Sequence, residues 1–260
     1  MRLSLFVCWM YAFCCAAVAQ GLQIRYAGDP LPEKDKAWIE RFLACEIEFY
    51  ARFGLRDTTG LQLTVFEKRQ DAWNYLDSLK IPLSSLNTSG MYIPRRREVV
   101  ILGREKQQEQ VLKFIVHELA HHLSRRTVKW MPGWLSEGLS EYFEHCRLGK
   151  KGLKHTFGDY ELGRIRTMYM LGEVDLKPFV DNADGDFRRK LHTDESYAYI
   201  LSHALVAFGL EVAEKEFMEN LIAMLNKRGP AVRCSQLIDE AYPGGFVRFE
   251  RDFAEFYNSR

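Results

Sequence analysis

The stretch Val111-Leu-Lys-Phe-Ile-Val-His-Glu-Leu-Ala-His-His-Leu123 is the most informative part of the chain. It has no Pro or Gly, and its many apolar residues predict a buried helix. His117 and His121 stand four residues apart, so on a helix they project from the same face, one turn above the other. Their imidazoles can therefore meet at one metal ion. Glu118 lies beside them, where it can accept a proton from a water molecule that the metal activates.

The alternative interpretation is a helix with surface histidines and a solvated glutamate. The flanking residues argue against it, because a buried helix needs such apolar side chains: Phe114, Ile115, Val116, Leu119 and Leu123. A His-Glu-x-x-His pattern in this context is typical of zinc metallopeptidases.

A catalytic zinc ion usually has three protein ligands and one open position. A motif extended by a third histidine would need Gly at position 124 and His at position 127. The chain has Ser124 and Thr127 instead, which excludes that class. The third ligand must therefore come from elsewhere in the chain.

A second helix is predicted after Pro132 and Gly133, which mark a turn. Glu137, Glu141 and Glu144 fall at i, i+4 and i+7, on one face of this helix. A solvated acidic stripe is the alternative interpretation. It is weakened by the apolar residues that make up much of the same helix: Trp134, Leu135, Leu139, Tyr142 and Phe143.

The string Trp134-Leu-Ser-Glu-Gly-Leu-Ser-Glu-Tyr142, placed after His-Glu-x-x-His, resembles the gluzincins, which include thermolysin and aminopeptidase N. In the aminopeptidase N group the Glu before Gly is the third zinc ligand, so the resemblance implies that role for Glu137. In thermolysin-like members an acid four residues later supports the first histidine through its second ring nitrogen, and Glu141 matches that position. The segment between His121 and Glu137 is slightly shorter than in those groups, which requires a tighter connection.

The pattern is nearer still to a set of secreted bacterial gluzincin-like proteins. In these, a strand like Gly90-Met91-Tyr92 precedes the metal helix, and a helix like Tyr199-Ile-Leu-Ser-His-Ala-Leu-Val-Ala-Phe208 follows it. The resemblance covers roughly residues 60–257, and only its central part is specific. Gluzincins use a Tyr or His beyond the third ligand to donate a hydrogen bond to the developing oxyanion. Tyr199 matches that residue best, Tyr197 and His203 are alternatives, and a core tyrosine without a catalytic role is an equal interpretation.

These residues together predict a single-zinc metallopeptidase with a zincin-like fold. One Zn²⁺ is held by His117, His121 and Glu137, and Glu118 is the base that later passes its proton to the leaving amine. The substrate is a peptide or protein. The Gly-x-Met-x-Asn motif with which the aminopeptidase N group holds a free amino terminus is absent, which favours an endopeptidase.

Two other functions compete with this prediction. One is a catalytically inactive binding or envelope-assembly protein that keeps the zincin fold. Glu118 argues against it, because a structural metal site needs no base. The other is a zinc hydrolase of a non-peptide amide.

The amino terminus predicts export. Residues 1–19 carry one basic residue, an apolar run and the small residues Ala17-Val18-Ala19, the pattern of a secretory signal peptide cut after Ala19. We therefore expect a secreted or periplasmic protein. No second apolar run of spanning length follows, so we expect no stable membrane insertion after cleavage. Cys45, Cys146 and Cys234 would remain, an odd number that permits at most one disulfide within a monomer.

The charge balance favours no nucleic-acid partner, because 36 basic residues face 35 acidic ones. Arg95-Arg96-Arg97 is predicted to be the tip of a hairpin. Among the remaining histidines, His122 is expected to be a packed or hydrogen-bonded neighbour of the site. His145, His155 and His192 have no partner at ligand spacing, so we expect them at the surface.

The chain is expected to be α+β and mainly α, with a mixed lobe at 20–104 and a helical lobe at 105–260 that together form one compact catalytic domain. Periodicity predicts the elements in the first lobe: helices at 31–53 and 72–79, and strands at 61–66, 91–93 and 98–102. After Glu105 the chain is predicted to be essentially helical, with breaks at 149–152, 181–185, 228–230 and 243–245. Residues 92–94 or 99–102 could form a sheet edge that pairs with an extended peptide, although an ordinary hairpin strand is the more common case.

Overall fold

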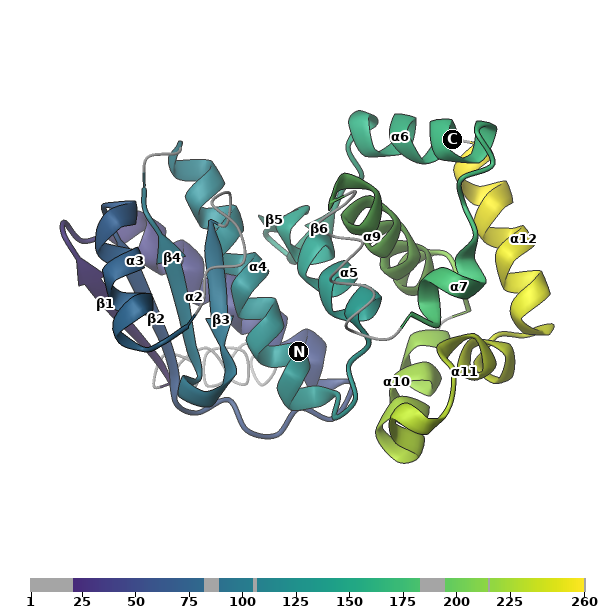
Figure 1. Ribbon diagram of the computed structural model, residues 1–260, viewed down its shortest axis with the longest axis horizontal. Helices are drawn as coiled ribbons and strands as arrows, with labels where there is room; N and C mark the ends of the chain where they lie inside the picture. Colours follow the sequence, from purple (N-terminus) through teal and green to yellow (C-terminus); the bar gives the residue numbers. More distant parts are fainter. Residues whose placement is uncertain (1–20, 82–88, 105–106, 183–194, 215, 260) are drawn as a thin grey trace, which may run out of the picture. The chain divides into compact units, whose positions relative to one another are not determined.

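The computed structural model describes residues 21–81, 89–104, 107–182, 195–214 and 216–259 (Figure 1). The predicted signal peptide at 1–19 and His192 lie outside the described residues. The chain forms two compact units. One ends at Leu123 and also takes in Leu148–Leu153, and the other comprises Ser124–Arg147 and the chain from Lys154 onward. The prediction of an α+β, mainly α fold is confirmed.

A four-stranded sheet forms the centre of the first unit, with the strand order β1-β2-β4-β3 (Figure 1). Its strands are β1 (Leu22–Ala27), β2 (Leu61–Phe66), β3 (Gly90–Ile93) and β4 (Glu98–Leu102). β1, β2 and β4 run parallel, whereas β3 pairs antiparallel with β4. All five residues of β4 are buried, as expected for an inner strand that is covered on both faces.

The helices of the first unit are α2 (Glu33–Ala51), α3 (Arg69–Ser78) and α4 (Gln108–Thr127). α3 packs against β2 and β4, where Ala72 and Leu76 meet Val100 and Leu102 in a buried cluster. α2 and α4 are joined by the Tyr50 hydroxyl, which donates to the carbonyl oxygen of Ala120 at 3.4 Å.

The predicted strands of this unit are found within one residue of their expected bounds, and β1 is an addition. Its residues alternate between intermediate and exposed, with Leu22, Ile24 and Tyr26 on the less exposed side. Residues 95–97 do lie at a hairpin tip: the 3₁₀ turn η1 (Pro94–Arg96) and a left-handed Arg97 with φ 52° connect β3 to β4.

The expectation that 99–102 could supply a sheet edge is wrong, because β4 is paired on both sides, with β2 and β3. β3 is the terminal strand of the sheet instead. Of the two candidate segments, only the one that begins in β3 keeps an unpaired side in the sheet.

The second unit is built mainly from helices (Figure 1): α5 (Gly133–Glu144), α6 (Asp159–Met170), α7 (Leu176–Val180), α9 (Glu195–Glu211), α10 (Phe217–Arg228), α11 (Cys234–Ala241) and α12 (Gly245–Asn258), with the 3₁₀ turn η2 (Gly229–Ala231). The expectation of an essentially helical chain after Glu105 misses one feature. β5 (Cys146–Gly149) and β6 (Gly152–His155) form a hairpin around residues 150–151, where only a break was expected.

The core of the second unit is aromatic where α12 covers α9. Phe249, Phe253 and Tyr257 recur at i, i+4 and i+8, so they line one face of α12 and are all buried. Phe208 of α9 packs against this face, and the Tyr257 hydroxyl donates to the carbonyl oxygen of Ala204 at 2.8 Å. None of the helices in the described part of the chain has the length and apolar character that a membrane crossing requires.

Candidate metal centre

Helix α4 carries His117 and His121 on adjacent turns of one face, as the sequence predicts. The helix forms because its opposite side is apolar and fully buried, with Leu119 and Ala120 at 0% exposure. The two imidazole rings lie 5.0 Å apart between centroids and are inclined by 77°. Both residues are half-buried, so packing restricts their rings.

Helix α5 carries the carboxylates. It begins at Gly133, directly after Pro132, whose φ of −68° suits a helix start. Gly138 follows Glu137 and has a packing role, since a Cβ at this position would collide with the backbone oxygen of Ser202 on α9. The Glu-Gly pair therefore places a carboxylate next to a point of close contact between α5 and α9.

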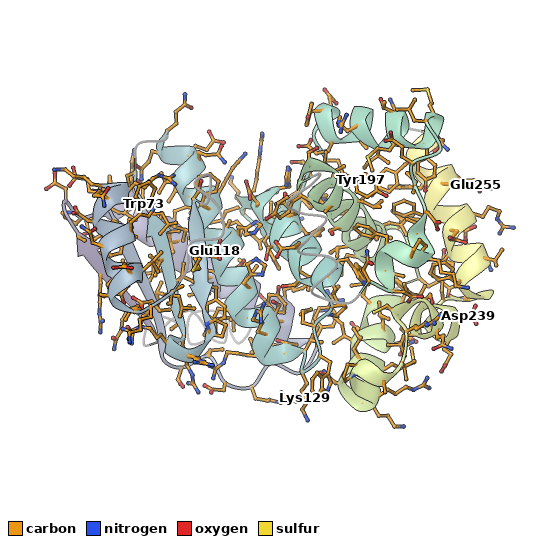
Figure 2. The ribbon with its side chains drawn as sticks, viewed as in Figure 1. Trp73, Glu118, Lys129, Tyr197, Asp239 and Glu255 are labelled. Atoms are coloured by element: carbon orange, nitrogen blue, oxygen red, sulfur yellow. The ribbon has the colours of Figure 1, made fainter. Side chains whose placement is uncertain are left out.

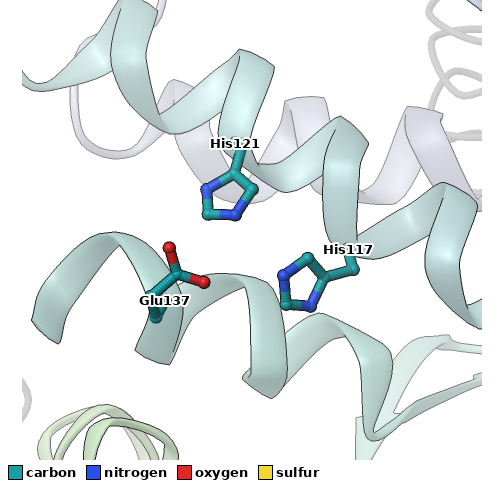
Figure 3. A group of neighbouring side chains, drawn as sticks. All are labelled: His117, His121 and Glu137. Carbon is teal, nitrogen blue, oxygen red and sulfur yellow. The ribbon is translucent and has the colours of Figure 1, made fainter. Parts of the chain in front are cut away.

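Two groups of side chains in the described residues could hold a metal ion. In the first, His117, His121 and Glu137 offer ligand atoms that all lie within 4.8 Å of one another. Figure 3 shows the two imidazoles on α4 and the Glu137 carboxylate on α5 pointing toward one another. The structure thus brings together the three residues that the sequence and the resemblance selected as ligands.

The second group shares His117 but joins it to Glu141 and Glu144, again within 4.8 Å. Two carboxylates and one imidazole form an oxygen-rich set, whereas the first group offers two imidazoles and one carboxylate. The set of two imidazoles and one carboxylate is typical of catalytic zinc, whereas magnesium and calcium prefer ligands that are all oxygen. The chemistry of the donors therefore fits zinc best at the first group. The acidic residues of α5 are half-buried, not a solvated stripe.

Glu118 lies against the sheet edge. It projects from α4 (Figure 2), and a Cβ placed on Gly90 would come within 2.8 Å of the Glu118 Cγ and 3.1 Å of Oε1. The missing side chain at Gly90 thus leaves room for this carboxylate beside strand β3. The geometry gives a physical reason for a glycine at the start of the terminal strand.

His122 behaves as predicted for a packed neighbour. It is fully buried, and its Nδ1 lies 3.1 Å from the Tyr92 hydroxyl. Burial lowers the pKa of His122 to about 4, and the nearby Arg97 charge acts in the same direction. The ring is therefore neutral at physiological pH, and it connects α4 to β3.

The three candidates for the oxyanion donor all lie on α9 but differ in their surroundings. Tyr199 is half-buried, one helical turn before His203. Tyr197 (Figure 2) donates from its hydroxyl to the carbonyl oxygen of Glu173 at 3.0 Å. The phenol of Tyr197 is therefore already engaged within the second unit.

The expectation that His145 and His155 are surface residues is wrong. Their side chains are 20% and 2% exposed, because both rings pack against His203. We call His145, His155 and His203 the histidine cluster. It joins the end of α5, strand β6 and helix α9, which are far apart in the sequence. No sequence spacing could predict it.

Polar contacts link the members of this cluster. His155 Nδ1 lies 2.7 Å from Glu211 Oε1, so this nitrogen donates to the carboxylate. His203 Nε2 lies 2.8 Å from His155 Nε2, and one of these two nitrogens carries the shared proton. The Nδ1 of His203 is buried and makes no hydrogen bond in the described structure. Burial, together with the neighbouring His145 and His155, lowers the pKa of His203 well below its usual value.

One further acidic residue near the metal helix was missed by the sequence analysis. Glu46 on α2 has no exposed surface, and burial raises its pKa well above the usual value, while the charge of His117 opposes that rise. Its only sequence signal is a carboxylate on the apolar side of a helix, aligned with Phe42 and Tyr50.

No protein-family model matches this sequence, and a search of curated proteins finds no similar one. The resemblance to gluzincins therefore remains a prediction that rests on the motif residues. What the structure adds is the convergence of His117, His121 and Glu137 into a group that could hold a metal ion.

Proposed function

We propose that the protein is a secreted, single-zinc metallopeptidase of the gluzincin type that cleaves internal peptide bonds. One observation carries the proposal: two imidazoles and one carboxylate offer converging ligand atoms, and the residue between the two histidines is a glutamate. Export is proposed from the pattern at residues 1–19. A buried structural site would not require Glu118.

The chemistry follows from the residues around the site. A bound zinc ion would polarise the substrate carbonyl and lower the pKa of water enough for attack at neutral pH. Glu118 accepts the proton from that water and returns it to the departing amine, as a general base and then a general acid. Tyr199 donates a hydrogen bond to the carbonyl oxygen as negative charge develops on it.

Strand β3 supports a peptide as the substrate class. It is the terminal strand of the sheet, and Gly90 at its start lies against Glu118. An extended peptide that pairs with β3 would run past the general base, and its backbone amides would satisfy the unpaired side of the strand. Recognition of the main chain also favours cleavage within a chain over cleavage of a terminal residue.

The test is metal analysis of the purified protein together with digestion of an unbiased peptide library. We expect about one zinc ion per chain and cleavage at internal bonds. Glu118→Gln should keep its zinc but lose about 10²- to 10⁴-fold in hydrolysis, because only the base is removed. Glu109→Gln is the matched control, because Glu109 is exposed in the first turn of the same helix.

Near-normal hydrolysis by Glu118→Gln would exclude the proposed mechanism. Zinc without any peptide cleavage would favour the binding or envelope-assembly protein. Cleavage of small amides but not of peptides would favour the non-peptide hydrolase.

A further inference from the structure

Among the described residues of the first unit, Glu46 and Glu98 are glutamates without exposed surface, and they differ in their hydrogen bonds. Glu98 accepts hydrogen bonds from Thr64, Tyr75 and Arg96 at 2.6–2.9 Å. Burial alone would raise the pKa of Glu98, but these hydrogen bonds outweigh it and lower the pKa. Neither carboxylate oxygen of Glu46 makes a hydrogen bond in the described structure. A buried carboxyl without a partner is costly, so its presence requires an explanation.

The position of Glu46 relative to α4 provides one. Tyr50 lies one turn after Glu46 on α2, and its hydroxyl contacts Ala120 on α4. His117 lies one turn before Ala120, and it is the charged group that lowers the pKa of Glu46 against the effect of burial. Figure 3 shows α2, in purple, behind the stretch of α4 that carries the two histidines. Glu46 therefore shares the face of α2 on which Tyr50 contacts α4, and it lies within electrostatic reach of His117, the first proposed metal ligand.

We propose that Glu46 is a positioning residue that supports His117 when a metal ion is bound. This inference rests on the proposed metal site. A ligating histidine commonly donates its second ring N–H to a carboxylate, which fixes the tautomer and the orientation of the ring. A metal ion on one nitrogen would make the N–H on the other nitrogen a stronger donor, and Glu46 would accept that hydrogen bond and partly balance the charge of the ion. The cost of burying Glu46 in the metal-free protein is thereby offset on metal binding.

Glu141 competes for the same role. The resemblance assigns it to the second nitrogen of His117, and its carboxylate does come within 4.8 Å of a His117 nitrogen. The Glu141 side chain, however, is 17% exposed, and water can solvate it. Glu46 has no such alternative, and an imidazole that binds a metal has only one nitrogen left. The inference thus transfers the supporting role from Glu141 to Glu46.

The experiment measures two quantities on each variant: the zinc affinity, by competition with a chelator, and the melting temperature of the metal-free protein. Glu46→Gln should weaken zinc binding by about 10- to 100-fold. Glu46→Leu should weaken zinc binding to a similar extent and raise the melting temperature of the metal-free protein, because an unsatisfied carboxyl is replaced by an apolar group.

Glu98→Gln is the matched control, because it also neutralises a buried glutamate of the same unit. It should lower the melting temperature and leave zinc affinity within about twofold of wild type, since Glu98 bonds to Thr64, Tyr75 and Arg96, none of which is a proposed metal ligand. Glu141→Gln should weaken zinc binding less than Glu46→Gln does.

Zinc affinity of Glu46→Gln within about twofold of wild type overturns the inference, as does a loss confined to Glu141→Gln. In both cases the wild-type protein still binds zinc and the proposed function stands. A wild-type protein that binds no zinc overturns the proposed function itself, together with this inference.

Discussion

His117 and His121 differ from the histidine cluster in what their ring nitrogens face. The first two come from one helix, are half-buried, and point their nitrogens toward a shared carboxylate. His145, His155 and His203 come from three separate elements, and their nitrogens are directed at carboxylates, a carbonyl oxygen or one another. Histidines brought together by folding are therefore not in themselves a metal site.

The use of opposite ring nitrogens explains the difference. His155 binds Glu211 through Nδ1 and His203 through Nε2, so its two partners lie on opposite sides of the ring and cannot share one ion. In the described part of the chain, every group whose ligand atoms converge within 4.8 Å includes His117. We therefore expect metal binding to depend on the first region and not on the histidine cluster.

The largest effect should come from removing the third ligand. Glu137→Ala should lose zinc outright and peptide hydrolysis with it, because two histidines alone leave the ion weakly held. His155→Gln should retain a full equivalent of zinc. Elemental analysis of both folded variants makes the comparison, and a zinc-free His155→Gln beside a fully loaded Glu137→Ala would reverse the roles of the two regions.

The next effect concerns α9, which carries both Tyr199 and His203. Tyr199→Phe should lower kcat by about 10²- to 10³-fold and change KM less, because its phenol acts only as charge develops in the transition state. Tyr197→Phe is the control, since the Tyr197 hydroxyl donates to the Glu173 carbonyl oxygen. Steady-state kinetics on a cleaved library peptide make the test. Unchanged turnover in Tyr199→Phe with a collapse in Tyr197→Phe or His203→Asn would move the role to another residue and leave the zinc ligands as they are.

The smallest effect is on stability against acid. The pKa values of His122 and His203 are lowered in the folded state. At mildly acidic pH the unfolded chain therefore binds more protons than the folded chain does. The stabilisation is complete above about pH 6.5 and is lost as the pH falls below it. For His122, with a pKa of about 4, the loss amounts to roughly 3 kcal/mol once the pH reaches 4.

Urea unfolding of the metal-free protein between pH 7.5 and pH 4 measures this dependence. His203→Asn and His122→Asn should each flatten the fall in the free energy of unfolding on acidification, whereas an exposed-site variant such as Glu109→Gln should not. A wild-type profile that stays level down to pH 4 would contradict the assignment of neutral, buried rings.

Much of the first unit could be predicted because its signals are local. β2 occupies the residues where alternation predicts it, and α4 follows from an apolar run without Pro or Gly. β1 was missed although Leu22, Ile24 and Tyr26 alternate, because the segment is short and follows directly on the predicted signal peptide. At 149–152 the sequence predicts only a break, where the structure has the hairpin of β5 and β6, because glycines in a chain of helices predict an interruption more readily than a pair of strands.

The sequence by itself determined the metal helix and the pairing of His117 with His121, since a spacing of four on a helix fixes which side chains share a face. Glu137 needed the resemblance as well, because its distance from the histidines depends on how α5 follows α4. Only the tertiary structure decided that Glu46 makes no hydrogen bond within the described part of the chain, and that His155 and His203 share one. These contacts join segments far apart in the chain, so no local pattern predicts them. Burial also exists only after the chain has folded, and it removes water as the alternative hydrogen-bond partner.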